Sequence, residues 1–305
     1  MLERTDTSIR QAFELFTNAT KLDSSYARAY VGLGQCYAEL GVRSYVSKDE
    51  ASLGMRSNAQ RALEIDQNLA EGHSLLSHAA WGVDDFLTAE LEARKAIELN
   101  PNLSIAYQNL ANLMLTLGYP KKAIELMEIG LLLDPLSPWL IRSLGQMLYY
   151  TGREEEALDL WRLNLKVAPF DVHLGLATYY FGKADYQNAE GEVRAMELLS
   201  SGDYNTSFMR GYLTALEGNV EGAKKIVDTL EHDFKGGATL ERNIGYIKYF
   251  LGDMDGFFEA MFHCVETRVI DPLTLRYAPL FEKARKDPRY SEVIKKVGLD
   301  PDLKE

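Results

Sequence analysis

The chain has 305 residues, 46% of them hydrophobic and 26% charged, which is typical of a folded protein and excludes a disordered or fibrous chain. Its formal net charge of −12 would repel phosphate backbones and anionic lipid headgroups, so we expect neither nucleic acid nor a membrane surface as a partner. Cys36 and Cys264 are too few for a disulfide framework. No apolar run approaches the roughly 20 residues of a spanning helix, and no signal-peptide core precedes Arg10. We therefore expect a cytoplasmic protein.

The first element in chain order is a predicted helix over residues 9–19. Ile9, Ala12, Phe16 and Ala19 recur on one face of it. The helix corresponds to the second half of a helical hairpin whose first helix is absent or short, so residues 1–26 are expected to form a half repeat. Its apolar stripe needs a cover. We expect missing upstream sequence, a second copy of the chain as a homo-oligomer, or another partner to supply it.

A helical phrase then recurs along the chain. Tyr30, Leu33, Gly34, Tyr37 and Gly41 stand at i, i+3, i+4, i+7 and i+11, which is one face of a helix that ends at a glycine. The phrase returns over residues 107–118 and 141–152, and an alanine five residues after each copy opens a second helix. The pattern therefore predicts helical hairpins.

The period of the hairpins is 34 residues. Pro101, Pro135 and Pro169 keep this spacing, and each stands where a second helix must stop, because proline cannot continue a helix. A fixed period of this length indicates a repeat in which one hairpin cannot bury its own apolar face and stacks on its neighbours. Function is then expected on a surface and not in a catalytic pocket.

Two irregularities interrupt this period. The alanine slot after Gly41 falls late, at Met55, in a helix that runs to Asp66. The step from Ala157 to Ala189 is 32 residues instead of 34, so two residues are missing near Phe170.

The pattern Tyr-x2-Leu-Gly-x2-Tyr at residues 30–37, and the later Ala89, Ala93, Ala96 and Pro101, resemble the tetratricopeptide repeat over nearly the whole chain. The resemblance implies an all-α fold, a right-handed superhelical solenoid of antiparallel helix pairs with about seven to eight repeats. It implies a single solenoid over residues 1–305, in which the half repeat is followed by repeats over 27–272 and by C-terminal capping helices over 273–305.

The carboxyl-terminal residues resemble two particular groups of tetratricopeptide proteins. Pro279-Leu280-Phe281, followed by Asp287-Pro288-Arg289-Tyr290, is similar to the closing segment of tetratricopeptide regions attached to class III nucleotide cyclases and winged-helix transcription activators. Nothing in these 305 residues resembles the catalytic or DNA-binding domains of those proteins.

The chain offers no constellation for chemistry. No two of its five histidines stand at the i, i+4 spacing that puts both rings on one helical face, so we expect no metal site. There is no glycine-rich phosphate loop and no Gly-x-Ser-x-Gly elbow. We therefore expect a protein that is not an enzyme and needs no cofactor.

The resemblance also implies a binding site, because in this family the first helix of each hairpin lines a concave groove. The positions that face the groove are mostly aromatic or amide side chains, which suit an extended or helical peptide. They are His78, Trp81, Gln108, Asn112, Arg142, Gln146, Tyr149, Tyr212, Arg242, Tyr246 and Tyr249. Some members of the family bind a terminal carboxylate through a lysine in the groove, and this chain has no lysine among these positions.

Two alternatives stay open. Tyr149, Tyr246 and Tyr249 either face a ligand or fill the interior of the superhelix. The chain is either a non-catalytic scaffold that binds a protein or peptide, for example as the assembly part of a signalling system, or a regulatory or sensory region acting in cis on a nucleotide cyclase or winged-helix domain.

Overall fold

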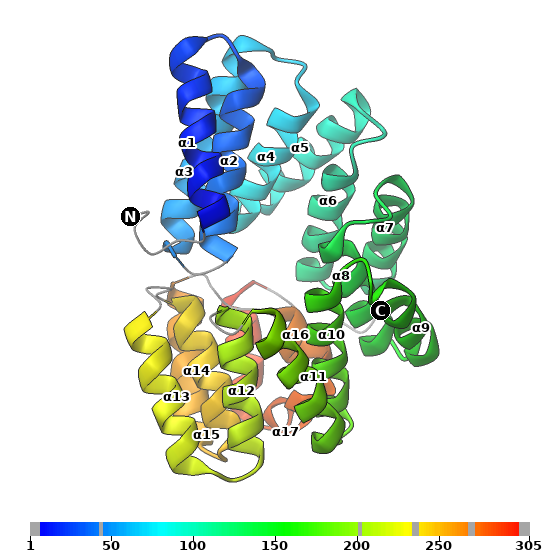
Figure 1. The fold of residues 1–305 in the computed structure, drawn as a ribbon, viewed down its shortest axis with the longest axis vertical. Coiled ribbons are helices and arrows are strands. Elements are labelled where there is room, and N and C mark those ends of the chain that lie inside the picture. Colours follow the sequence, from blue (N-terminus) through cyan, green and yellow to red (C-terminus); the bar gives the residue numbers. More distant parts are fainter. Residues whose placement is uncertain (1–6, 43–44, 201–202, 234–237, 268–271, 299–305) are drawn as a thin grey trace. The chain divides into compact units, whose positions relative to one another are not determined.

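The structure is a computed structural model that describes residues 7–42, 45–200, 203–233, 238–267 and 272–298 (Figure 1). Every regular element within these ranges is helical, and none is a strand. The predicted all-α fold is confirmed. None of the described helices is both long enough and apolar enough to cross a bilayer.

The chain divides into two compact units. Among the described residues, the first unit ends at Leu113 and the second begins at Met114, inside one helix. Each unit has a hydrophobic core of its own. The expected single solenoid, with its half repeat and C-terminal capping helices, stays a prediction.

From α1 to α5, consecutive helices of the first unit pack against each other, and α2 also contacts α4. The helices are α1 (Thr7–Leu22), α2 (Ala27–Val42), α3 (Lys48–Ile65), α4 (Ala70–Gly82), α5 (Phe86–Leu99) and the start of α6 (Ser104–Leu117). The helix expected around Met55 is α3. It begins before Met55, at Lys48, because the Ser47 hydroxyl caps it by accepting a hydrogen bond from the Glu50 amide.

The apolar stripe of α1 is covered from within the unit. Ile9 is buried, and the Phe13 ring meets Tyr37 of α2 edge-on at 5.5 Å between centroids. Phe16 packs on Gly32, where an added Cβ would lie 2.5 Å from its ring. The large apolar side chain left most exposed on this helix is Leu22, at its carboxyl end.

The second unit repeats hairpins whose first helices are α8, α10, α12 and α14. The helices are α7 (Pro120–Leu133), α8 (Pro138–Tyr150), α9 (Glu154–Asn164), α10 (Pro169–Gly182), α11 (Tyr186–Leu199), α12 (Tyr204–Leu216), α13 (Val220–Asp233), α14 (Ala238–Phe250), α15 (Met254–Glu266), α16 (Pro272–Tyr277), the 3-10 helix η2 (Pro279–Phe281), α17 (Glu282–Arg285) and α18 (Pro288–Lys296). The first helices contact one another in chain order and form what we call the first-helix layer.

Helix ends follow the sequence signals with one difference. Gly118 and Gly152 adopt left-handed φ values of 89° and 84° just after α6 and α8, as helix-ending glycines do. Gly41, by contrast, lies inside α2, which runs on to Val42. The shorter period near Phe170 arises because α9 has 11 residues where α7 has 14.

Small residues let the helices of the second unit approach closely. Trp161 of α9 is fully buried between Gly145 of α8 and Gly175 of α10. A Cβ at Gly145 would lie 2.3 Å from the indole Nε1, and one at Gly175 would lie 2.7 Å from Cε2. The recurring pattern therefore has glycine at this position because the tryptophan leaves no room for a Cβ.

The substitution Gly145→Ala is expected to destabilise the protein by about 1–3 kcal/mol, because the buried indole has no room to move away. Urea unfolding followed by circular dichroism measures the change. Gly191→Ala in α11 is the matched control, since no atom lies within 4 Å of an added Cβ there. The control should stabilise by about 0.5–1 kcal/mol. Equal effects of the two substitutions would contradict this packing account.

Candidate peptide-binding groove

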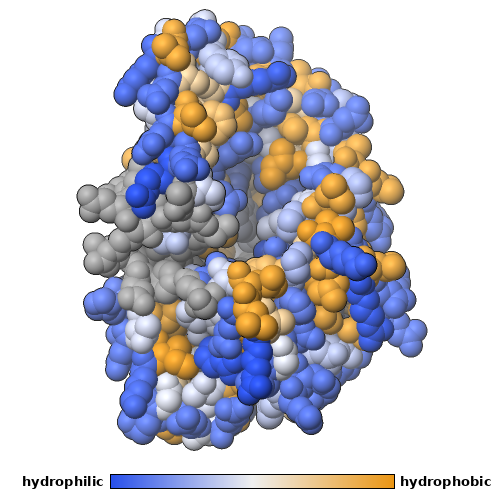
Figure 2. Space-filling view, viewed as in Figure 1, coloured by the Kyte–Doolittle hydropathy of each residue, from blue (hydrophilic) through white to orange (hydrophobic). Residues whose placement is uncertain are grey.

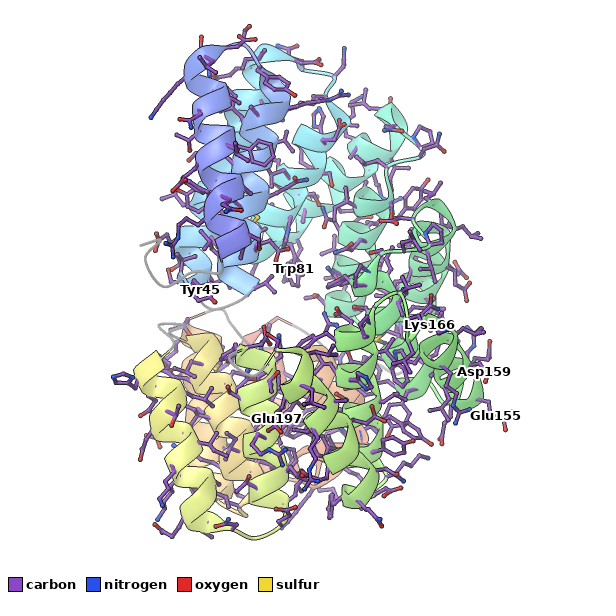
Figure 3. The ribbon with its side chains drawn as sticks, in the orientation of Figure 1. Tyr45, Trp81, Glu155, Asp159, Lys166 and Glu197 are labelled. Carbon is purple, nitrogen blue, oxygen red and sulfur yellow. The ribbon has the colours of Figure 1, made fainter. Side chains whose placement is uncertain are left out.

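In the first unit, the four predicted groove residues are all partly exposed. His78 and Trp81 lie on α4, with ring centroids 5.9 Å apart, and Gln108 and Asn112 lie on α6. Trp81 is labelled in Figure 3. Burial lowers the pKa of His78 to about 4, so its imidazole is neutral at physiological pH. These residues offer an aromatic surface next to amide groups.

A buried hydrogen bond fixes α4 beside α6. The Asn109 side-chain amide donates to the backbone carbonyl of Ser74 at 2.8 Å and contacts the Ser74 hydroxyl at 3.0 Å. Both residues are buried, so breaking the contact would leave polar groups without partners. This bond joins α4 to α6 within the first unit.

In the second unit, the polar groove residues of α8 are engaged internally. The Arg142 guanidinium donates to Asp171 of α10 at 2.9 Å, and the two side chains are 27% and 28% exposed. The Gln146 amide donates to the Tyr150 hydroxyl at 2.8 Å. The carboxylate that Arg142 binds thus comes from its own chain.

Tyr149, Tyr212 and Tyr246 are buried, with 6%, 7% and 4% of their surface exposed. The Tyr149 ring meets Tyr179 edge-on at 5.1 Å, and its hydroxyl packs on Gly182 with no hydrogen-bond partner among the described residues. Burial raises the pKa of Tyr149 to about 12. For these three rings, burial favours the packing alternative over contact with a ligand.

Polar groups join Tyr212 to α14. Its hydroxyl donates to Asn243 at 3.3 Å, and the Asn243 amide donates to the Tyr204 hydroxyl at 2.6 Å. Asn243 could not be recognised from the sequence, because its position carries no recurring residue type. The chain of bonds ties α12 to α14.

The remaining groove residues lie on α14. Arg242 lies near the buried thiol of Cys264, whose pKa burial raises to about 12. Tyr246 and Tyr249 contact the chain's own tail: their ring centroids lie 4.6 Å and 4.9 Å from that of Phe281. Pro279-Leu280-Phe281 is part of a resemblance visible in the sequence, but a sequence pattern does not show which helix a tail packs against. That any of the eleven predicted residues binds a peptide stays a prediction.

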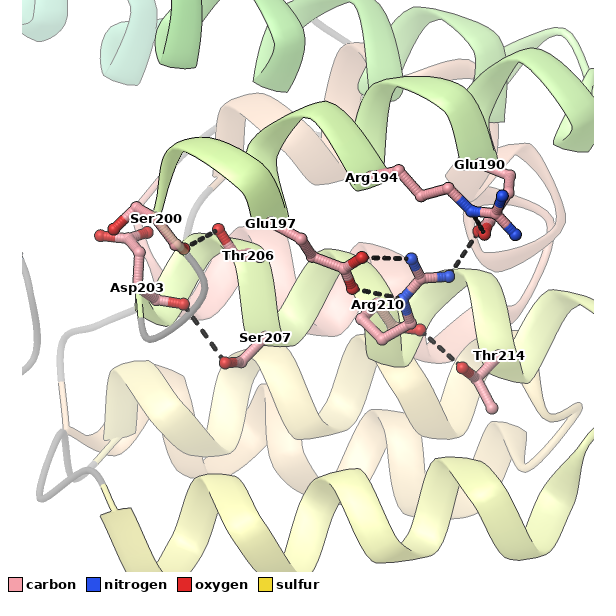
Figure 4. A network of polar contacts seen from close by, with 9 residues as sticks. All are labelled: Glu190, Arg194, Glu197, Ser200, Asp203, Thr206, Ser207, Arg210 and Thr214. Atoms are coloured by element: carbon pink, nitrogen blue, oxygen red, sulfur yellow. Dashed lines mark hydrogen bonds and ion pairs between the residues drawn. The ribbon is translucent and has the colours of Figure 1, made fainter.

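A polar network ties α11 to α12 (Figure 4). The Arg210 guanidinium donates to both carboxylate oxygens of Glu197, at 2.8 Å and 2.9 Å, and also to Glu190. Arg194 donates to Glu190 as well. Burial acts to raise the pKa of Glu190, but the two arginines outweigh it and the pKa is lowered.

Apolar surface gathers over α7 and α8 in the space-filling view (Figure 2). On α7 and in the turn after it, Leu132 and Leu136 are 82% and 64% exposed. Exposed apolar patches are common where proteins bind partners. The run Leu131-Leu132-Leu133 indicates that this part of the helix is apolar, but helical periodicity alone does not tell which leucine faces water.

Within the described residues, no three His, Cys, Asp or Glu side chains come together in a way that could hold a metal ion.

Comparison with family models gives no match. Over 107 residues, the chain is 31% identical to the small glutamine-rich tetratricopeptide repeat-containing protein 2 of Mycosarcoma maydis, a match that covers 35% of this chain and 29% of that protein. Over 150 residues it is 25% identical to the transcriptional regulator HilA of Salmonella typhimurium, covering 48% and 27%. The matches thus span less than a third of the length of these curated relatives.

Two solved structures share the fold. One is the Cut9-Hcn1 hetero-tetramer of the APC/C, with a TM-score of 0.62, 12% identity and coverage of 95% of this chain and 52% of that chain. The other is yeast Tom70, with a TM-score of 0.55, 15% identity and coverage of 96% and 64%. Both neighbours are solenoids of tetratricopeptide repeats.

Substitutions at Tyr149 distinguish packing from binding. Tyr149→Ala should destabilise the protein by about 3–5 kcal/mol, because it empties a filled core site. Tyr149→Phe should leave stability unchanged or raise it, since it removes a buried hydroxyl that lacks a partner. Tyr26→Ala, at a half-exposed site, is the control. Urea midpoints measure all three, and wild-type stability in Tyr149→Ala would contradict the packing role.

The Arg210 network predicts an acid-sensitive contribution to stability. The pKa of Glu190 in the folded chain lies below its ordinary value of 4.5, so the stabilisation is complete above that pH and is lost as the pH falls through the folded pKa. Arg210→Met should therefore flatten the fall of the urea midpoint between about pH 5 and pH 3. Lys224→Met, which breaks an exposed pair with Glu221, should leave the slope as in the wild type. Equal slopes in all three proteins would contradict the prediction.

Proposed function

We infer that this chain of tetratricopeptide repeats is a non-catalytic protein-interaction scaffold, and we propose that it binds a peptide segment of a partner at the α4–α6 face of the first unit. One contrast carries the proposal. The groove residues of α4 and α6 are partly exposed, whereas Tyr149, Tyr212 and Tyr246 of the second unit are buried.

The chemistry of this face suits a peptide. Trp81 can bury an apolar side chain of a partner, and large aromatic side chains often dominate the energy of such contacts. The Gln108 amide can both donate to and accept from a peptide backbone. Because His78 is neutral, the face carries no cation there to repel a basic partner. The net charge of −12 favours association with a positively charged segment.

Trp81→Ala should abolish partner capture while leaving helicity and the urea midpoint little changed. The measurement is affinity capture from the native lysate, read by mass spectrometry, with wild type, Trp81→Ala and Tyr26→Ala side by side. Tyr26 is an exposed aromatic residue of the same unit on a different helix, so it controls for a general loss of aromatic surface. A protein held by wild type and Tyr26→Ala but lost from Trp81→Ala is expected, and equal capture by all three would contradict the proposal.

A second candidate is a regulatory or sensory region that acts in cis on a winged-helix regulator or a nucleotide cyclase. The similarity to a transcriptional regulator over 150 residues favours it. The natural reading frame decides: an adjoining effector domain of either kind would support the second candidate, and its absence there would leave the scaffold acting alone. A cytoplasmic location stays an expectation in either case.

A further inference from the structure

The chain's tail lies on the first-helix layer of the second unit. After α15 the hairpin pattern ends, and η2 contacts α10, which lies two hairpins before α14. In Figure 1 the orange and red helices α16 and α17 lie behind α10 and α12. The tail thus lies on the first-helix layer, which is the surface expected from the sequence to bind a ligand.

Phe281 anchors this tail in a cluster of aromatic rings. Only 2% of its surface is exposed. Its ring lies 4.6 Å from Tyr246, 4.9 Å from Tyr249 and 5.8 Å from Phe250, and it stacks on Phe257 at 5.9 Å with an interplanar angle of 12°. These contacts give the tail an apolar anchor in a desolvated pocket, as in peptide recognition.

A side chain of the layer also holds the backbone of the tail. The Tyr249 hydroxyl donates to the carbonyl of Leu280 at 2.9 Å. Tyr249 is a predicted groove residue, and a groove side chain bonded to the main chain of a short segment is the arrangement expected for a bound peptide.

The tail keeps its shape largely through bonds of its own. The Arg285 guanidinium donates to the carbonyls of Ala278 at 2.8 Å and Leu275 at 3.0 Å. These bonds close residues 275–285 into a compact turn that presents Phe281 to the layer.

A second segment, α18, also covers the last hairpin. α18 packs on α15, its residues Val293 and Ile294 are buried, and the Arg289 guanidinium lies 4.4 Å from the centroid of the Phe258 ring. The last hairpin therefore packs against α18 as well as against Phe281 of the tail.

We propose that residues 272–281 are an internal ligand of the first-helix layer of the second unit, and that this layer accepts in their place a partner segment of the same chemistry. That chemistry is a short apolar turn which presents an aromatic ring and, just before it, a free backbone carbonyl. Docking of the tail and of the partner segment then exclude each other. This proposal does not depend on the α4–α6 face, so either can fail alone.

The test uses the full chain and a synthetic peptide with the sequence of residues 272–285 as the probe. Phe281→Ala empties the aromatic pocket, so the peptide should bind this variant at least about tenfold more tightly than the wild type, in which the tail competes. Phe262→Ala, on α15 away from the pocket, should bind as the wild type does. Adding Tyr249→Phe to Phe281→Ala should weaken binding about threefold through loss of one hydrogen bond. Peptide affinity for folded Phe281→Ala no tighter than for wild type would overturn the proposal.

Hydrogen exchange of the wild type decides the case if Phe281→Ala does not fold. The amides of Ala278 and Phe281 are bonded within the tail, to Thr274 and Ala278. An internal ligand should open alone, so these amides should exchange through an opening of lower free energy than those of α14. Exchange of both sets through one common opening would overturn the proposal.

Discussion

The structure depends on the close approach of helices at glycine, because no hairpin can bury its own apolar face. The second unit shows this at Trp161, an indole enclosed between two glycines from the hairpins on either side. In the first unit, Gly34 meets Leu75 in the same way, since an added Cβ would lie 2.2 Å from that side chain. Each of these large side chains packs against a glycine, which has no side chain of its own. This contact sets the distance between neighbouring hairpins.

Packing and binding compete for the same positions in such an array. The first helices must contact each other to form a layer, and the side chains that face the layer are the ones that a peptide would touch. In the second unit Tyr149 is buried, Arg142 forms an ion pair with Asp171, and the Tyr246 ring contacts Phe281 of the tail. In the first unit, His78 and Trp81 keep surface available. The two units therefore carry the same repeat pattern with different surfaces.

Much of the fold could be predicted from the sequence, because helical periodicity and the 34-residue period are local signals. The helix pairs of the second unit follow the alanine and glycine positions, and Gly118 and Gly152 end helices as expected. Helix ends that depend on a cap, such as Ser47 at the start of α3, were missed. The burial of Tyr149 and the pairing of Arg142 with Asp171 could not be predicted, because both depend on how far a neighbouring hairpin rotates. The fold-back of Phe281 depends on tertiary contacts that no sequence period encodes.

Solvent accessibility of individual side chains tests the central claim most directly, namely that the layer of the second unit is filled while the α4–α6 face is open. Hydroxyl-radical footprinting of the full chain, read residue by residue, measures it. We expect Trp81 to be oxidised readily, and Tyr246 and Phe281 to be protected relative to the half-exposed Tyr26. Oxidation of Tyr246 and Phe281 as fast as that of Tyr26, with Trp81 protected, would contradict the account.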